Sequence, residues 1–215
     1  QHRLLKWFDE NHRIFPWRED RATKYQQIVS EILLQRTKAE TVAKYYDTFF
    51  SKFPDWNALA NASLEELEEI MKPLGLYRHR ARRLYKLGED IRRRGGRIPG
   101  DENELRDSGF IGLYVTNAFE LFILKNRKPL LDVNMSRLLK RYFKPGDFID
   151  VRHDKEIQEL ANDIIEVRRC KELNWAILDY AALVCKSRNP LCGECVLNRY
   201  CKYYELLKGY IPSLP

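Results

Sequence analysis

Apolar residues recur every three to four positions along most of this chain, which is the spacing of amphipathic α-helices. A first helix has an apolar face made of Leu4, Leu5, Trp7 and Phe8. A second helix is predicted from about 25 to 36, with its apolar positions at Ile28, Val29, Ile32 and Leu33. Further helices are predicted at 79–94, 101–108, 113–126, 133–143, 154–168 and 171–184. No segment alternates polar and apolar residues as a half-buried strand does, so the predicted fold class is all-α.

Two segments between these helices have a residue pattern that is typical of the N-terminus of a helix. Thr37-Lys-Ala-Glu40 and Ser63-Leu-Glu-Glu66 both fit the capping box, in which a hydroxyl and a carboxyl cap backbone N–H groups of the first turn. We expect the first box to open a helix that runs through residue 50, and the second to open a short helix that ends near residue 71. Phe15-Pro16-Trp17 interrupts the helical pattern near the beginning of the chain.

Composition narrows the class of partner. The 215 residues carry a formal charge of +7, and 44% of them are hydrophobic. That charge suits a nucleic-acid partner, although charge alone speaks only to non-specific binding. No apolar run approaches the roughly 18 residues of a membrane span, and no signal peptide is evident. We therefore expect no membrane association.

Four cysteines near the end of the chain follow the spacing C-x6-C-x2-C-x5-C, at Cys185, Cys192, Cys195 and Cys201. The short loops must bring the four thiols close together. Disulfides are one interpretation, although they usually staple small secreted domains. Structural zinc is another, although zinc usually takes two C-x2-C knuckles. A [4Fe–4S] cluster held by four thiolates fits the spacing best.

The fifth cysteine, Cys170, has no neighbouring cysteine in the sequence, and we interpret it as a free structural thiol. Clustered metal-binding thiols together with an odd free one are typical of a reducing compartment. We expect the cytoplasm, close to the nucleoid, if the source is prokaryotic, and the nucleus if it is eukaryotic.

Three further segments contain residues that could bind a phosphate or act as catalytic carboxylates. Ser108-Gly-Phe-Ile-Gly-Leu-Tyr114 is a glycine-containing turn between two predicted helices, and such a turn can bring backbone N–H groups against a phosphate. Asp132 precedes the helix 133–143, where it could simply be an N-cap. Glu31 lies on the margin of an apolar helix face, where it could also be an ordinary exposed carboxylate.

Together, the cysteine loop, the glycine turn, Asp132 and Glu31 resemble the helix–hairpin–helix DNA glycosylases of the endonuclease III superfamily. The resemblance extends from Phe15 to about Tyr204 and implies two helical domains with a DNA cleft between them. The first domain would span 22–131. The second would combine 1–21 with 132–215 and hold the [4Fe–4S] cluster, in a structural role that orients DNA.

The resemblance implies a hydrolytic reaction. Asp132 looks like the superfamily's catalytic aspartate, whose charge would stabilise an oxocarbenium-like transition state. Bifunctional members carry a lysine eighteen residues earlier, where this chain has Tyr114. A phenol cannot form a Schiff base, so we expect an intact strand with an abasic site as the product.

Glu31 and Tyr114 are carried over as catalytic residues beside Asp132, and Glu31 would act on the expelled base. Other residues are carried over as binding residues. Gln35 and Leu76 would fill the gap that the base leaves, and Trp17 would line the base pocket. The remaining residues expected in the base pocket or at DNA are Arg36, Thr37, Arg80, Gly109, Gly112, Asn134 and Arg137. The hairpin departs from the family pattern because Phe110 replaces a glycine and Leu113 replaces a basic residue. We expect this to weaken its hold on phosphate or to shift it onto Gly109.

Three functions remain open from the sequence. The first is removal of thymine or uracil opposite guanine, which the pattern Asp132-x-Asn134-x-x-Arg137 favours over endonuclease III itself. The second is removal of adenine opposite 8-oxoguanine, as in MutY-type enzymes, which the short segment after Cys201 disfavours. The third is a DNA-binding cluster protein without catalysis. The expected partner is double-stranded DNA with a mismatched or damaged base, bound by a monomer.

Overall fold

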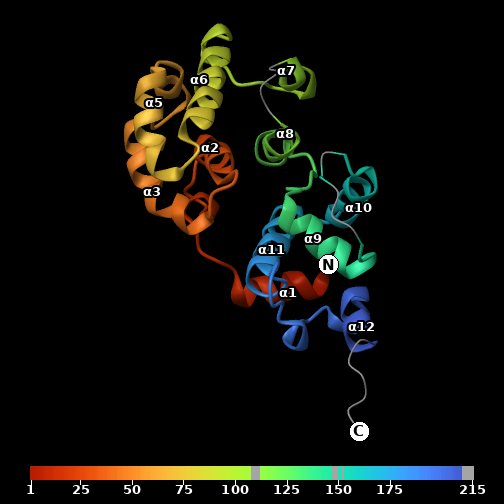
Figure 1. Ribbon diagram of the computed structural model, residues 1–215. Coiled ribbons are helices and arrows are strands. Elements are labelled where there is room, and N and C mark those ends of the chain that lie inside the picture. The colour runs from red at the N-terminus through yellow and green to blue at the C-terminus, as the bar shows by residue number, and fades with distance from the viewer. Residues whose placement is uncertain (108–111, 147–149, 152, 210–215) are drawn as a thin grey trace. The chain divides into compact units, whose positions relative to one another are not determined.

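The computed structural model describes residues 1–107, 112–146, 150–151 and 153–209, and its described part is helical without strands (Figure 1). The all-α prediction is therefore confirmed. The chain divides into two compact units, one made of Ile14–Asn126 and the other of Gln1–Arg13 with Arg127–Pro215. In the described residues, no helix is long and apolar enough to cross a membrane. The domain limits expected from the sequence stay a prediction.

The unit Ile14–Asn126 contains α2 to α8 with three short helical segments. Its elements are η1 (Pro16–Arg18), α2 (Lys24–Leu34), α3 (Ala39–Lys52), α4 (Trp56–Ala60), α5 (Leu64–Met71), η2 (Lys72–Leu74), α6 (Tyr77–Arg93), α7 (Glu102–Asp107), α8 (Leu113–Phe119) and η3 (Glu120–Leu124). Helices α4 and α5 pack on α6, while α2 packs on both α3 and α8. The packing of α2 on α8 brings together Glu31 of α2 and Tyr114 of α8, two of the predicted site residues.

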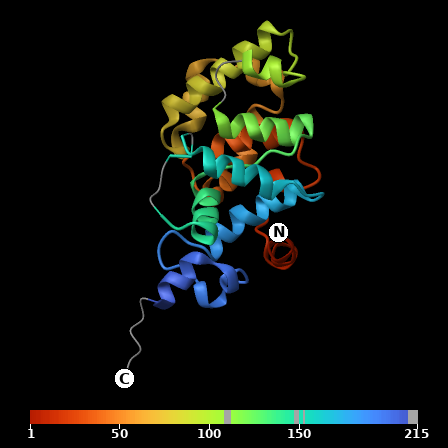
Figure 2. The ribbon, with the colours of Figure 1, turned by 90° about the vertical axis from the view of Figure 1, so that its right-hand side faces the viewer.

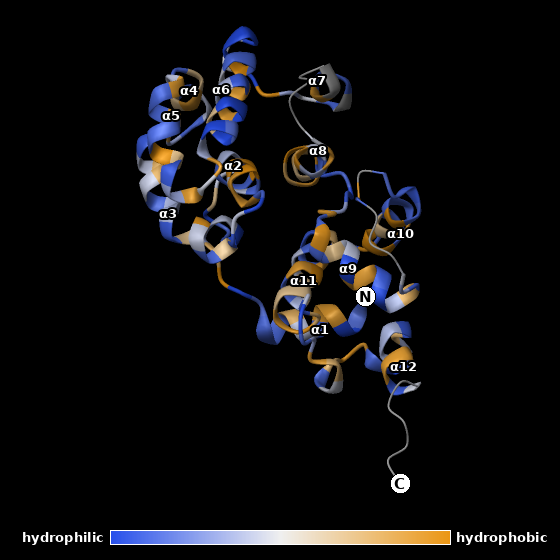
Figure 3. Ribbon diagram, viewed as in Figure 1, coloured by the Kyte–Doolittle hydropathy of each residue, from blue (hydrophilic) through white to orange (hydrophobic). Residues whose placement is uncertain are grey.

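The second unit brings the two ends of the chain together. Its elements are α1 (His2–Asn11), α9 (Val133–Phe143), α10 (Lys155–Ile165), α11 (Cys170–Leu183), η4 (Cys192–Glu194), η5 (Asn198–Tyr200) and α12 (Lys202–Gly209). Helix α1 packs on α11, and α9 packs on α10, α11 and α12 (Figures 1 and 2). Helix α11 is hydrophobic on most of its surface and forms the centre of this unit (Figure 3).

Most predicted helices are confirmed within a few residues, and 133–143 coincides with α9. The capping box of Ser63 and Glu66 is also confirmed. The one expected at Thr37 is wrong, because α3 begins after Lys38 without a side-chain cap. The Thr37 hydroxyl donates instead to the carbonyl of Leu74, 3.4 Å away. Pairing with a carbonyl distant in sequence removes this hydroxyl from the cap.

Candidate functional site

Asp132 caps the N-terminus of α9 and is held by three donors. Its Oδ1 accepts from the backbone N–H groups of Asn134 and Met135, each at 2.8 Å, and its Oδ2 accepts from Asn134 Nδ2 at 2.6 Å. Burial raises the pKa of Asp132, while these donors and the charge of Arg137 lower it. The carboxylate is therefore fixed in orientation and desolvated.

Arg137 connects this carboxylate to the cysteine loop. Its Nη1 donates to Asn134 Oδ1 at 3.0 Å, and its Nε donates to the carbonyl of Cys185 at 3.1 Å. A third bond runs from Nη2 to the carbonyl of Ala181 at 2.8 Å. The predicted residues Asp132, Asn134 and Arg137 thus form one hydrogen-bonded chain that ends at the first cysteine of the loop.

A buried amide fixes the segment that leads to Asp132. Asn174, in α11, accepts from the backbone N–H of Leu130 at 2.6 Å and donates to the carbonyl of Lys128 at 3.2 Å. Its side chain is fully buried. Asn174 is not among the residues predicted from the sequence, although a lone amide within the apolar stretch Leu-Asn-Trp-Ala-Ile-Leu is a signal for it.

Glu31 and Tyr114 form a direct contact between α2 and α8. The Tyr114 hydroxyl donates to Glu31 Oε2 at 2.7 Å. Glu31 is only 2% exposed, which excludes the interpretation as an ordinary solvent-exposed carboxylate. Two predicted catalytic residues that are 83 positions apart are therefore brought together.

Of the predicted residues Trp17, Gly112 and Gly109, the structure describes the first two. Trp17 lies in the core, stacked on Phe15 with ring centroids 4.7 Å apart, so its part in a base pocket stays a prediction. Gly112 is the exposed N-cap of α8, and a Cβ there would meet no protein atom within 4 Å. Contacts within the described residues thus do not require a glycine at this position. Gly109, with the rest of 108–111, lies outside the described residues.

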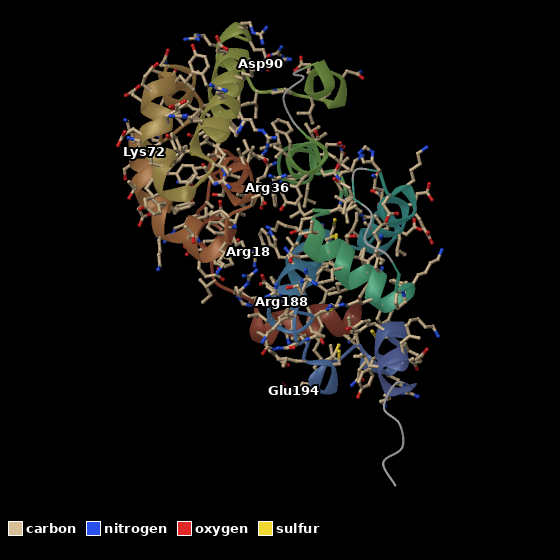
Figure 4. All side chains as sticks on the ribbon, in the orientation of Figure 1. Arg18, Arg36, Lys72, Asp90, Arg188 and Glu194 are labelled. Carbon is tan, nitrogen blue, oxygen red and sulfur yellow. The ribbon has the colours of Figure 1, made fainter. Side chains whose placement is uncertain are left out.

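Two loops of the unit Ile14–Asn126 carry residues that are predicted to enter or bind DNA. Gln35 and Arg36 follow α2, and Leu76 immediately precedes α6. Leu76 is 53% exposed, although it is a large apolar side chain. Arg36 (Figure 4) and Leu76 both have left-handed backbone, with φ of 59° and 48°, which non-glycine residues adopt only at a cost. An exposed, strained leucine suits contact with a partner better than packing within this chain.

Helix α6 carries a series of cations beside these loops. Arg78, Arg82, Arg83 and Lys86 are exposed, as the side chains that bind phosphates would be. Arg80 is different, because it is only 5% exposed and its guanidinium donates to the carbonyls of Leu74 and Gln35. Arg80 is predicted from the sequence to lie in the base pocket or at DNA, whereas in the structure its guanidinium has acceptors inside the protein.

The four clustered cysteines line one small cavity together with Arg141, Tyr203 and Tyr204. Burial and the three neighbouring thiols raise the pKa of Cys192. The Tyr180 hydroxyl donates to Cys195 Sγ at 3.2 Å, and Arg141 Nη1 lies 3.6 Å from Cys185 Sγ. Thiols that raise one another's pKa need a strong positive charge to be held together as thiolates.

The four thiols around this cavity are compatible with an iron–sulfur cluster, which spreads four thiolates over several irons. No residue of η4, η5 or α12 is buried, so an apolar core does not hold this segment together. Glu194 lies in the same loop (Figure 4).

Two family models match this chain, one over most of its helices and one over the cysteine loop. Residues 29–180 match the family model described as HhH-GPD superfamily base excision DNA repair protein. Residues 185–201 match the iron-sulfur binding domain of endonuclease III, and this range begins at Cys185 and ends at Cys201. The first model covers more than half of the chain, and the second covers the cysteine loop.

Individual proteins that are similar to this chain are DNA glycosylases. A thymine/uracil-DNA glycosylase of Methanothermobacter thermautotrophicus is 31% identical over 204 residues, which are 94% of this chain and 91% of the relative. An adenine DNA glycosylase of Mus musculus is 31% identical over an alignment of 227 positions, gaps included, which covers 99% of this chain and 43% of the relative. The solved structure of a thermostable thymine-DNA glycosylase superposes with a TM-score of 0.85 at 30% identity, covering 95% of this chain and 94% of that one.

Proposed function

Because the chain belongs to the HhH-GPD superfamily of base excision DNA repair proteins, we propose that it removes thymine or uracil paired with guanine in double-stranded DNA. The chain is a DNA glycosylase with an iron–sulfur binding domain. The names of the Methanothermobacter relative and of the similar solved structure support this choice of base. The observation that carries the chemistry is the triply held carboxylate of Asp132.

Asp132 acts on the sugar of the extruded nucleotide. As the glycosidic bond breaks, positive charge develops on the sugar, and a fixed carboxylate stabilises that charge without having to reorient. The Asn134 amide and the two backbone donors keep the carboxylate directed. A water molecule then completes hydrolysis and leaves an abasic site.

Glu31 and Tyr114 act on the base. A buried carboxylate fixed by a phenol can accept the N3–H of thymine or uracil, and this hydrogen bond identifies the pyrimidine edge. Because removal requires that the base leaves the helical stack, such a contact forms only with an extruded base. Glu31 therefore contributes to the choice of substrate as well as to the rate.

The reaction proceeds without a covalent intermediate on α8. The helical segment from Leu113 to Leu124 contains no lysine, and Tyr114 occupies the position at which bifunctional relatives carry one. Borohydride should therefore trap no complex between the wild-type protein and its DNA substrate. A trapped complex would contradict this part of the proposal.

The four cysteine thiolates would hold the iron–sulfur cluster and shape the chain around it. When bound, the cluster supplies cross-links between residues 185 and 201 in a segment without buried side chains of its own. Arg141 and Tyr180 contact two of the sulfur atoms. The proposed hydrolysis requires no change in the oxidation state of the cluster.

The direct test is a base-release assay on a panel of duplexes. We expect release of thymine and uracil opposite guanine and little release of adenine opposite 8-oxoguanine. Asp132→Asn should abolish release while DNA binding persists, because the amide keeps the shape of the side chain but removes its charge. If Asp132→Asn lost binding and kept turnover per complex, Asp132 would be only a helix cap.

Glu31→Gln separates the pyrimidine substrate from the purine one. An amide can still hydrogen-bond to a pyrimidine edge, so the variant should keep part of its uracil release. Adenine is a poor leaving group that needs a proton, which an amide cannot supply. Adenine release by the wild type that Glu31→Gln abolishes, without thymine or uracil release, would assign the second function.

A further inference from the structure

Two loops of the unit Ile14–Asn126 are joined by one side chain. The first loop, Gln35–Thr37, leads from α2 to α3, and the second, Leu74–Leu76, leads from η2 to α6. The guanidinium of Arg80 donates from Nη1 to the Leu74 carbonyl at 3.2 Å and from Nη2 to the Gln35 carbonyl. These carbonyls are 39 positions apart in the sequence, so the contact is a tertiary bridge and not part of a helix cap.

The bridge fixes the backbone beside both strained positions. Arg36 and Leu76, with φ of 59° and 48°, each follow within two residues of a bridged carbonyl. The Thr37 hydroxyl also donates to the Leu74 carbonyl, at 3.4 Å. Each loop is thus held to the other at the point where its backbone turns into the left-handed region.

A second arginine fixes the side chain at the tip of the first loop. Arg83, one turn further along α6, donates from Nη1 to Gln35 Oε1 at 2.5 Å. Arg80 itself is 5% exposed and forms no ion pair in the described part of the chain. Burying an unpaired cation is expensive, and desolvation lowers the pKa of Arg80. A fold that needed only a filled space here could use an apolar side chain instead.

We propose that Arg80 is a positioning residue that couples the loops Gln35–Thr37 and Leu74–Leu76, so that Gln35 and Leu76 enter DNA as one rigid pair. This inference rests on the proposed function, because it concerns the extrusion step before base release. The exposed Leu76 is the apolar group that replaces lost base stacking, and Gln35 is the polar group beside it. Arg80 contacts neither DNA nor the reacting atoms.

The test measures insertion independently of base release. One duplex carries a tetrahydrofuran abasic-site analogue opposite 2-aminopurine, and a second is the fully paired duplex of the same sequence. The dissociation constant for the paired duplex divided by that for the abasic duplex reports the preference for a gap in the base stack. The fluorescence of 2-aminopurine reports insertion beside the base that has lost its partner. Arg80→Met and Arg80→Lys should each lower the ratio about tenfold and reduce the fluorescence change. Lysine retains the charge but lacks the planar fork that reaches two carbonyls.

Arg82→Met is the matched control, because Arg82 is an exposed cation on the same helix. It should weaken binding to both duplexes in the same proportion and reduce the salt dependence of binding, while the ratio and the fluorescence change stay as in the wild type. Arg80 variants that behaved in this way would assign Arg80 to phosphate binding. Arg80 variants that kept both the ratio and the fluorescence change would leave it a purely structural residue.

Two further variants keep the test independent of folding. If Arg80→Met fails to fold, Arg80→Lys and Thr37→Val take its place, and Thr37→Val should lower the ratio less because it removes one of two donors to Leu74. Gln35→Ala combined with Arg80→Lys should lose less than the sum of the single effects, since both act through one loop. Uracil release by the wild type is measured in parallel. Its absence would overturn the proposed substrate, while the abasic duplex still decides the role of Arg80.

Discussion

The carboxylate of Asp132 caps a helix and is also the proposed catalytic group of this chain. Capping supplies the backbone donors of Asn134 and Met135, and the Asn134 amide adds a third donor from outside the helix backbone. A cap needs only the backbone donors. The additional amide and its link to Arg137 are therefore features of a site that holds a charged carboxylate in one orientation.

This arrangement predicts the acid side of the pH–rate profile. Burial raises the pKa of Asp132, and the reaction needs its ionised form, so activity is lost as the pH falls through that raised pKa. The Asn134 amide lowers this pKa, and Asn134→Ala should therefore move the acid limb to higher pH. Single-turnover release of uracil across a pH series measures the shift. An unchanged acid limb in Asn134→Ala would mean that another group controls it.

Tyr114 supplies a second prediction for a single residue. Tyr114→Phe removes the hydroxyl that donates to Glu31 and leaves the ring in place. Loss of one hydrogen bond to a carboxylate should slow base release about tenfold, with little change in the melting temperature. Single-turnover rates together with thermal unfolding separate the two effects. An equal loss of rate in Tyr142→Phe, a tyrosine on another helix, would show that the effect is not specific to the contact with Glu31.

Helix α11 works as a connector between several parts of one unit. Asn174 near its beginning holds the segment before Asp132, and Tyr180 near its end contacts the cysteine loop. Asp179 is fully buried and accepts two hydrogen bonds from Arg13, at 3.0 and 2.8 Å, which ties the segment after α1 to the same helix. Each of these polar residues interrupts an apolar helix face and has a defined partner.

The contact of Tyr180 with Cys195 should slow the loss of iron from the wild-type protein. Tyr180→Phe removes the bond to Cys195 Sγ and leaves the backbone N–H of Val196 without its 2.8 Å acceptor. Partners of metal ligands commonly change metal affinity by about 10- to 100-fold. We expect the variant to lose its visible cluster absorbance faster in the presence of a chelator. Tyr203→Phe, which changes a tyrosine on the same cavity wall, is the control and should lose iron at the wild-type rate.

The sequence predicts helices better than it predicts their contacts. Helix α9 was located correctly because its apolar period and its Asp132 cap are both local signals. Thr37 was misread as a cap because the carbonyl that takes its hydroxyl belongs to Leu74, 37 positions away. Helices α4 and α12 are short and were not predicted at all. Local periodicity is weak over one or two turns, and packing decides such segments instead.

The same limit applies to the candidate site. The four cysteines could be named from their spacing, whereas Asp132 and Glu31 were named from the resemblance to DNA glycosylases, and their catalytic roles stay predictions. The role of Arg80 could not be read, because five cations lie within nine residues of α6 and only tertiary structure shows that one of them is buried. The lone amide of Asn174 in an apolar stretch was a signal, but its partners, like those of Tyr180, could not be read from the sequence because they lie in other segments.

For the whole molecule, the division into two units predicts that the cluster stabilises one of them selectively. Cys192→Ser should prevent stable cluster binding and destabilise the unit that contains Arg127–Pro215, because its last elements have no buried residues. Ile14–Asn126 has its own core and should keep its helices. Thermal unfolding followed by circular dichroism should then show two transitions in the variant, and the difference between their midpoint temperatures should be larger than in the wild type. A single cooperative transition at the wild-type temperature would contradict a stabilising role for the cluster.

The formation of one unit from both ends of the chain has a consequence for synthesis on the ribosome. Residues 14–126 are continuous, so they can fold as soon as they leave the exit tunnel. Helix α1 emerges earlier but must wait for α11, which is made more than 150 residues later. The cysteine loop emerges later still. A nascent chain therefore completes its loops for DNA before it completes the unit with Asp132, and iron is acquired after the unit Ile14–Asn126 has folded.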